Sequence, residues 1–100
     1  MTNMIDRAQV TEAVRDIISE ALAVSRDRVM PNARIISDLQ AESIDVADVR
    51  FRLEHHFNIR IDQRQMTVAI GAGLSAEEFD SNFTVQFIID YVIGIISFVQ

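Results

Sequence analysis

The chain has 100 residues, of which 49% are hydrophobic; this is enough for one domain, residues 1–100, with a sizeable core, and leaves no room for a second. It contains no cysteine, which excludes disulfides, thiolate metal sites and cysteine nucleophiles. The net charge is −6 and all nine basic residues are arginine, a balance that argues against nucleic-acid binding and suits basic protein partners.

The first predicted helix spans residues 4 to 23, where apolar residues recur at intervals of three and four. Charged residues occupy most of the other positions and form a solvated face. This segment also carries Asp6, Glu12 and Asp16 and has no uninterrupted apolar run, unlike a signal peptide or a membrane span. We therefore expect a cytoplasmic protein that is not integral to a membrane.

Residues 24 to 42 form a long connection, because the periodicity lapses there and Pro31 interrupts any continuing helix. We expect a short turn near residues 26 to 29. The apolar residues of the connection are too many for a free linker and are predicted to pack over the helices: Val29, Met30, Ile35, Ile36 and Leu39. Loops of this length are usually functional.

The stretch from residue 38 to residue 57 contains a predicted helix with a serine at its start and two apolar stripes. At 100° per residue, one stripe falls within a sector about 80° wide and is assigned to the core. The second projects from nearly the opposite side, where a one-sided surface helix needs no apolar residues. The core stripe comprises Val46, Val49, Leu53 and Phe57, and the second stripe comprises Ile44, Ala47 and Phe51.

Ser43 has two interpretations on this evidence. Serine is a favoured N-cap, so a purely structural role is possible. The other interpretation is a modified serine, because the N-terminus of a helix stabilises a phosphate group. No lysine exists and the nearest histidines lie three turns away, so Ser43 is not expected to be a catalytic nucleophile.

His55 and His56 are the two histidines of the chain and are candidate metal ligands. Adjacent residues on a helix point about 100° apart, so this pair cannot chelate one ion. No metal site is predicted.

The remaining third of the chain is predicted to be mostly helical. Residues 58 to 62 alternate like a strand but are too few to stand alone. In residues 63 to 82, helical turns are expected at 66–70 and at 75–79, where Ser75 and Glu78 have the spacing of a capping box. Residues 84 to 99 form an apolar last helix too short to span a bilayer, and its surplus apolar surface is either buried core or covered by a partner or a second copy.

Two runs of residues closely resemble the acyl carrier proteins: Asp38-Leu39-x-x-Glu42-Ser43-Ile44, and Leu53-Glu54-x-x-Phe57-x-Ile59-x-Ile61. In that family the first pattern reads Asp-Leu-Gly-x-Asp-Ser-Leu, and its serine carries a phosphopantetheine arm. The chain departs from it with Gln40 for glycine, Glu42 for aspartate and Ile44 for leucine. Glycine permits a positive φ that glutamine disfavours, so the departure at Gln40 puts the shape of the loop in question.

The resemblance implies an all-α fold, a small four-helix bundle with a long first loop and an expanded segment between helices two and four. It implies 4'-phosphopantetheine on Ser43, attached by a phosphopantetheinyl transferase, and a carrier that is not itself an enzyme. Acyl synthases and acyltransferases with basic docking surfaces are the further partners implied. The docking residues are then Glu42, Ile44, Asp45, Ala47, Asp48, Phe51 and Glu54.

The expanded segment, with Met66-Thr67 and residues 75 to 79, is similar to a branch of carriers for the very long acyl chains of lipid A. Fatty-acid or lipid biosynthesis is the expected setting, and the last helix could line an acyl tunnel. Two alternatives share the helical fold: an aminoacyl or peptidyl carrier, and a non-carrier interaction module in which Ser43 is only a cap.

Overall fold

The computed structural model describes residues 6 to 99. Its α-helices are α1 (Arg7–Leu22), α2 (Ser43–Phe57), α3 (Gln63–Gly71), α4 (Ala76–Asn82) and α5 (Val85–Val99). A short 3₁₀ helix, η1 (Arg26–Arg28), follows α1, where the sequence predicts a turn. The all-α prediction is confirmed, and the expanded segment contributes two short helices, so the described residues contain five α-helices.

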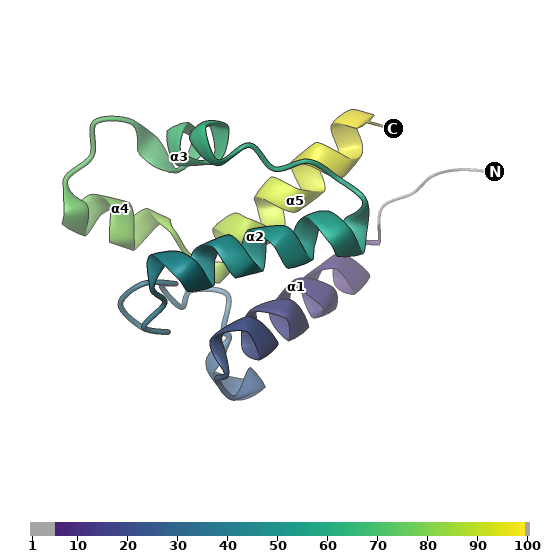
Figure 1. The fold of residues 1–100 in the computed structure, drawn as a ribbon, viewed down its shortest axis with the longest axis horizontal. Coiled ribbons are helices and arrows are strands. Elements are labelled where there is room, and N and C mark those ends of the chain that lie inside the picture. Colours follow the sequence, from purple (N-terminus) through teal and green to yellow (C-terminus); the bar gives the residue numbers. More distant parts are fainter. Residues whose placement is uncertain (1–5, 100) are drawn as a thin grey trace.

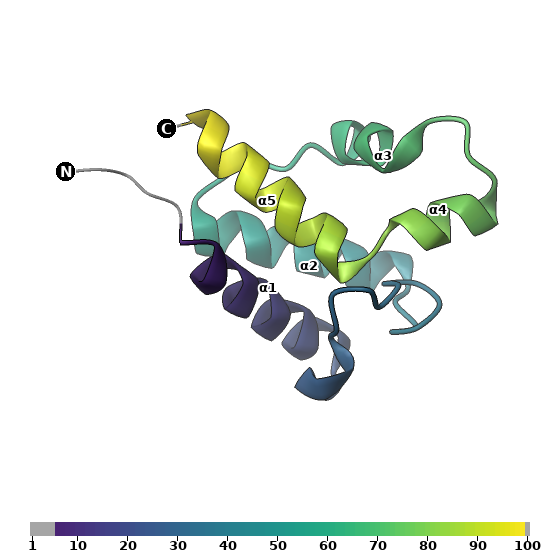
Figure 2. The ribbon, with the colours of Figure 1, turned by 180° about the vertical axis from the view of Figure 1, so that it is seen from behind.

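The helices are arranged around α2. Figure 1 shows α1 on one side of α2, with α3 and α4 on the other side, and α5 behind. Figure 2, from the opposite side, shows α5 crossing in front of α2 and beside α1. Helix α1 contacts both α2 and α5, and α3 contacts α4. The N-terminus of α2 lies at the same end of the molecule as α4 (Figure 1).

Polar side chains determine where several helices begin. The Asp6 carboxylate accepts from the N–H groups of Ala8 (3.0 Å) and Gln9 (3.3 Å) at the start of α1. Asp62 accepts from the N–H of Gln65 at the start of α3 (3.0 Å). Each bond satisfies an N–H group that has no partner within its own helix.

The start of α4 confirms the predicted capping box. The Glu78 N–H donates to Ser75 Oγ (3.2 Å), and the Ser75 N–H donates to Glu78 Oε1 (2.9 Å). This backbone hydrogen bond, with a smaller contribution from the serine hydroxyl, lowers the pKa of Glu78 below its ordinary value of 4.5.

The buried apolar side chains form one cluster at the junction of α1, α2 and α5. On α2 the predicted core stripe is confirmed, with Val49 and Leu53 buried and Val46 and Phe57 partly buried against the cluster. The fully buried side chains with the largest volumes are Val14, Ile18, Val29, Ile35, Val85, Ile89 and Val92. Helix α5 buries one face and leaves Gly94 and Ser97 exposed.

The long connection packs over the helices through only part of its apolar residues. Val29, Ile35 and Leu39 are buried, as predicted. The prediction is wrong for Met30 and Ile36, whose exposed fractions are 51% and 40%. Each directly follows a buried residue in extended or turn backbone, where successive side chains point to different sides.

No helix among the described residues is both long and apolar enough to cross a membrane.

Candidate functional site

Ser43 is the first residue of α2, and its side chain is exposed. The N-cap of α2 is Glu42, whose N–H donates to Asp45 Oδ2 (2.9 Å). Among the described residues, the Ser43 hydroxyl makes no hydrogen bond. The interpretation of Ser43 as a structural cap is therefore wrong, because a glutamate takes that position and leaves the hydroxyl unused.

Two buried residues anchor the loop that precedes Ser43. Leu39 and Ala41 are 3% and 8% exposed, and their N–H groups donate to the carbonyls of Arg34 (3.0 Å) and Ile35 (3.1 Å). Between them, Gln40 has a φ of 59°, in the left-handed region. Gln40 thus adopts the positive φ that glycine permits most readily.

A single carboxylate on α4 also holds this loop. Asp80 Oδ1 accepts from the Ser37 N–H (3.1 Å), and Asp80 Oδ2 accepts from Arg34 Nη1 (3.4 Å). The Asp80 side chain is only 18% exposed. Helix α4 and the loop that leads to Ser43 are therefore tied together.

The carboxylates around Ser43 are mostly engaged with the backbone. Asp38 Oδ2 accepts from the Arg34 N–H (2.8 Å), and Asp45 accepts from the Glu42 N–H as described above. Arg28 Nη2 donates to the Asp38 carbonyl (2.7 Å) and adds a positive charge near the loop. A phosphate on Ser43 would meet the positive end of the α2 dipole, with two of these carboxylates held by their own bonds.

The second stripe of α2 forms an exposed surface beside Ser43. Ile44 and Phe51 are 72% and 57% exposed, whereas Ala47 is half-buried. A shallow hollow on this surface is lined by five of the seven predicted docking residues: Ile44, Asp45, Ala47, Asp48 and Phe51. We call this set the α2 surface. It combines apolar side chains with carboxylates, of which Asp48 pairs with Arg52 one turn later (3.1 Å).

The other two predicted docking residues lie elsewhere. Glu42 lines a separate groove together with Ser43. Glu54 is half-buried, and its carboxylate accepts from the Ile61 N–H (2.8 Å), so it fastens the connector that follows α2. Its part in docking stays a prediction.

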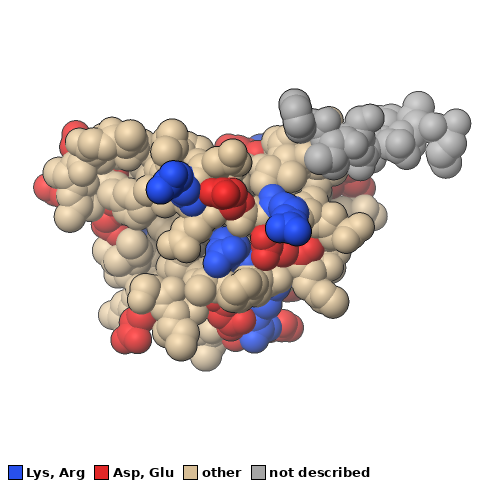
Figure 3. All heavy atoms as spheres, turned by 45° about the horizontal axis from the view of Figure 1, so that its top comes forward, with Lys and Arg blue, Asp and Glu red and all other residues tan. Residues whose placement is uncertain are grey.

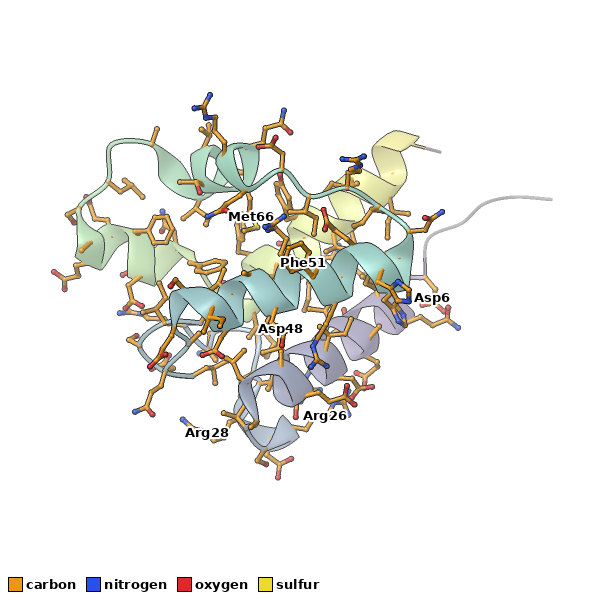
Figure 4. All side chains as sticks on the ribbon, in the orientation of Figure 1. Asp6, Arg26, Arg28, Asp48, Phe51 and Met66 are labelled. Carbon is orange, nitrogen blue, oxygen red and sulfur yellow. The ribbon has the colours of Figure 1, made fainter. Side chains whose placement is uncertain are left out.

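A groove begins at Ser43 and runs between α2, α3 and α4. We call it the outer groove; its volume is about 330 Å³, and its floor includes Val46, Ile70 and Phe83. A second hollow, the inner cavity, lies deeper between α2 and α5 and has a volume of about 20 Å³. This is room for about one water molecule. Figure 4 shows Met66 pointing from α3 toward α2, and its side chain lines both hollows.

Arg50 lines both hollows as well, and its position was not predicted from the sequence. A signal was nevertheless present. Arg50 lies seven residues after Ser43 and four after Val46, which places all three on nearly one face of α2. A charged residue at the edge of the core stripe is unusual, and this position indicates that Arg50 borders the core.

Tyr91, a residue of α5, also lines the inner cavity. Burial, with a lesser contribution from the charge of Asp62, raises the pKa of Tyr91 above its ordinary value of 10.0. The phenol is therefore neutral at neutral pH.

The two histidines of the chain lie near the end of α2, far from Ser43. His55 and His56 are exposed and lie about 18 Å along α2 from Ser43, at 1.5 Å per residue. Among the described residues, no three His, Asp or Glu side chains gather as a possible metal site. On the face shown in Figure 3, acidic and basic side chains are interspersed, and most of the surface is neither. The site offers an exposed hydroxyl, an apolar groove and a mixed surface.

The chain matches the family model described as "Phosphopantetheine attachment site" over residues 12–70, a range that includes Ser43. Among curated proteins, it is 30% identical over 86 residues to an acyl carrier protein of Chlorobium phaeobacteroides, covering 86% of this chain and 94% of the relative. It is 33% identical over 63 residues to an acyl carrier protein of Thermotoga maritima, covering 63% and 78%. It is also 33% identical over 69 residues to "Acyl carrier protein AcpXL" of Rhizobium meliloti, covering 68% and 73%.

Proposed function

Because this chain belongs to the acyl carrier protein family, which carries acyl chains on covalent 4'-phosphopantetheine, we propose that Ser43 is the residue that bears the arm. One observation supports this assignment above the others: Ser43 is exposed at the first turn of α2 while Glu42 takes the capping role. The protein is a carrier in fatty-acid or lipid synthesis and not a catalyst.

The residues around Ser43 suit this role. The N-terminus of α2 stabilises the phosphodiester by about 0.3 to 1 kcal/mol. The thiol at the end of the arm supplies the chemistry, since it holds acyl groups as thioesters. The outer groove, which begins at Ser43, offers apolar surface to the hydrocarbon part of the load.

We assign docking of partner enzymes to the α2 surface. Its exposed Ile44 and Phe51 supply apolar area, and Asp45 and Asp48 supply negative charge. A complementary partner presents an apolar patch with arginine or lysine around it, and the net charge of −6 speeds the encounter. The partners proposed are a phosphopantetheinyl transferase and the acyl synthases and acyltransferases that load and unload the carrier.

The attachment site is tested by incubating the protein with coenzyme A, magnesium and a permissive phosphopantetheinyl transferase. The intact mass is expected to rise by one phosphopantetheine, and Ser43→Ala is expected to stay unmodified. Ser37→Ala is the matched control, because Ser37 is an exposed serine of the same loop whose side chain makes no hydrogen bond among the described residues. Modification of Ser43→Ala would contradict the assignment.

We further propose that the load belongs to lipid synthesis of the lipid A type. The motivation is the likeness of residues 66 to 79 to carriers of very long acyl chains, together with the similarity to a protein named AcpXL. Helices α3 and α4, which this segment forms, supply much of the wall of the outer groove. Mass spectrometry of the protein isolated from its own host tests this proposal, and an aminoacyl or peptidyl load would contradict it.

A further inference from the structure

The outer groove and the inner cavity share one wall. Four side chains line both hollows: Val46 and Arg50 from α2, Met66 from α3, and Phe83 from the segment between α4 and α5. Met66 is unbranched and flexible, so this wall can open without a change of the backbone. A chain that enters the outer groove from Ser43 and reaches the inner cavity therefore passes between these four side chains, one of which is Arg50.

Among the residues that the structure describes, Arg50 is the only charged one that lines the inner cavity. Its neighbours in that lining are apolar except for the Tyr91 phenol. In the outer groove, the hydroxyl of Thr67 is already engaged, since it donates to the Gln63 carbonyl (2.9 Å). The Arg50 side chain thus brings a positive charge to the wall that the outer groove and the inner cavity share.

Most of the hydrogen-bonding capacity of Arg50 is unused. A guanidinium has five N–H donors. Arg50 Nη1 donates to the Ile61 carbonyl at 3.4 Å, and the guanidinium carbon lies 4.7 Å from the centre of the Phe51 ring. Within the part of the chain that the structure describes, Arg50 forms no ion pair, in contrast to Arg34 with Asp80 and Arg52 with Asp48.

The position of Arg50 relative to Ser43 suits a contact with the load. The two residues are seven apart, which is about 10.5 Å along the axis of α2 and about 20° apart around it. A saturated hydrocarbon that passes the guanidinium would strip it of water without replacing the lost hydrogen bonds. An oxygen atom on the chain would replace them with a charge-assisted hydrogen bond.

From this geometry we infer that Arg50 is a specificity residue, which selects acyl chains that carry an oxygen near the thioester. The chemical class is 3-hydroxyacyl and 3-oxoacyl thioesters. Arg50 donates to that oxygen at the shared wall, and the hydrocarbon beyond it passes Met66 toward the inner cavity. This inference rests on the proposed attachment of the arm to Ser43.

The test compares loads of equal length on the full chain. Octanoyl, 3-hydroxyoctanoyl and 3-oxooctanoyl groups are attached by the transferase from the corresponding coenzyme A thioesters. The rate of thioester exchange with the thiol dithiothreitol is divided by the rate for the same acyl group on free pantetheine, which gives a protection factor for each load. In the unsubstituted protein, the protection factor is expected to be higher for the two oxygenated chains than for octanoyl.

Arg50→Met removes the guanidinium and keeps an unbranched side chain. The advantage of the oxygenated chains is expected to fall about tenfold, as for the loss of a hydrogen bond to a charged group. Arg50→Lys retains a charged donor and is expected to restore part of the advantage. Arg64→Met is the charge-matched control: Arg64 is exposed on α3 and lines neither hollow, so this variant should behave like the unsubstituted protein.

The inference is overturned if Arg50→Met leaves the advantage intact, or if it lowers the protection of octanoyl and oxygenated loads equally. The latter outcome would place the hydrogen bond on the arm or the thioester carbonyl. A second measurement needs no variant: the side-chain N–H resonances of Arg50 should move with 3-hydroxyoctanoyl and stay in place with octanoyl. If Ser43 is not the attachment site, Ser43→Ala still gains mass, which separates that failure from a failure at Arg50.

Discussion

Gln40 holds a backbone conformation that costs a non-glycine residue about 1 to 2 kcal/mol. Part of this cost is recovered, because glycine would lose more conformational freedom on folding, by about 0.4 to 1 kcal/mol. The loop retains its course because buried Leu39 and Ala41 fix both ends of the left-handed residue. The motif position therefore depends on the φ angle, and glycine is one way of obtaining it.

We predict that Gln40→Gly stabilises the protein by about 0.8 kcal/mol, the difference between the midpoints of these two ranges. Gln40→Val should destabilise it by about 1 kcal/mol, because a β-branched side chain fits the left-handed region poorly. Urea denaturation of the two variants beside the unsubstituted protein measures both effects. A valine variant as stable as the glycine variant would be incompatible with the left-handed conformation.

Glu78 makes the stability of the fold depend on pH. Its pKa is lowered in the folded protein by the Ser75 N–H, so its carboxylate contributes stability above the unfolded pKa near 4.5. That contribution is lost as the pH falls through the lower, folded pKa. We predict that Glu78→Gln lowers the urea midpoint at pH 6 and has little effect at pH 3. An equal effect at both pH values would show that the charge is not involved.

At the scale of the helix, α2 separates two functions on two faces. Leu53 is 3% exposed in the core, whereas Phe51 is 57% exposed on the α2 surface. Leu53→Ala should destabilise the protein by about 3 kcal/mol through the lost contacts and the cavity left behind. Phe51→Ala should cost less than about 1 kcal/mol, mainly its contact with the Arg50 guanidinium.

The prediction for partner docking is the reverse. Phe51→Ala should raise the KM of the phosphopantetheinyl transferase, and Leu53→Ala, measured below its unfolding transition, should leave that KM nearly unchanged. Thermal unfolding and transferase kinetics on both variants give the comparison. Equal KM values for Phe51→Ala and the unsubstituted protein would remove Phe51 from the docking surface.

The start of α4 and the two faces of α2 can be predicted from the sequence, because both depend on residues close together in the chain. The Ser75 and Glu78 spacing gave the start of α4, and the two stripes of α2 were read correctly from a period of 3.6 residues. The exposure of Met30 and Ile36 does not follow from the sequence, because no periodicity tells which way a loop side chain points. The setting of Arg50 does not follow from it either, because it depends on α3 and α5, which close around α2 only in the folded chain.

At the scale of the whole molecule, a long load competes with the packing of the core. The inner cavity of about 20 Å³ has no room for a chain unless α2, α3 and α5 adjust. Each methylene removed from water contributes about 0.8 kcal/mol, so a dozen could contribute up to about 10 kcal/mol before the costs of rearrangement. This is as large as the typical net stability of a domain, about 5 to 15 kcal/mol.

We therefore predict that amide exchange in α2 and α5 changes when a long acyl group is attached, and that the unfolding temperature rises. The comparison is between the long-chain form and an acetyl form, both carrying the same arm. Since acetyl is too short to reach the shared wall, it controls for the arm itself. Identical exchange rates in the two forms would mean that the load stays outside the bundle.

The pair of hydrogen bonds at Asp80 has a mechanical consequence. The outer groove widens most simply when α4 swings outward, yet Asp80 on α4 is bonded to Ser37 and Arg34 of the segment before Ser43. An outward swing must either break both bonds or drag that segment along. The conformation of the loop at Ser43 is thus coupled to the length of the acyl chain in the outer groove.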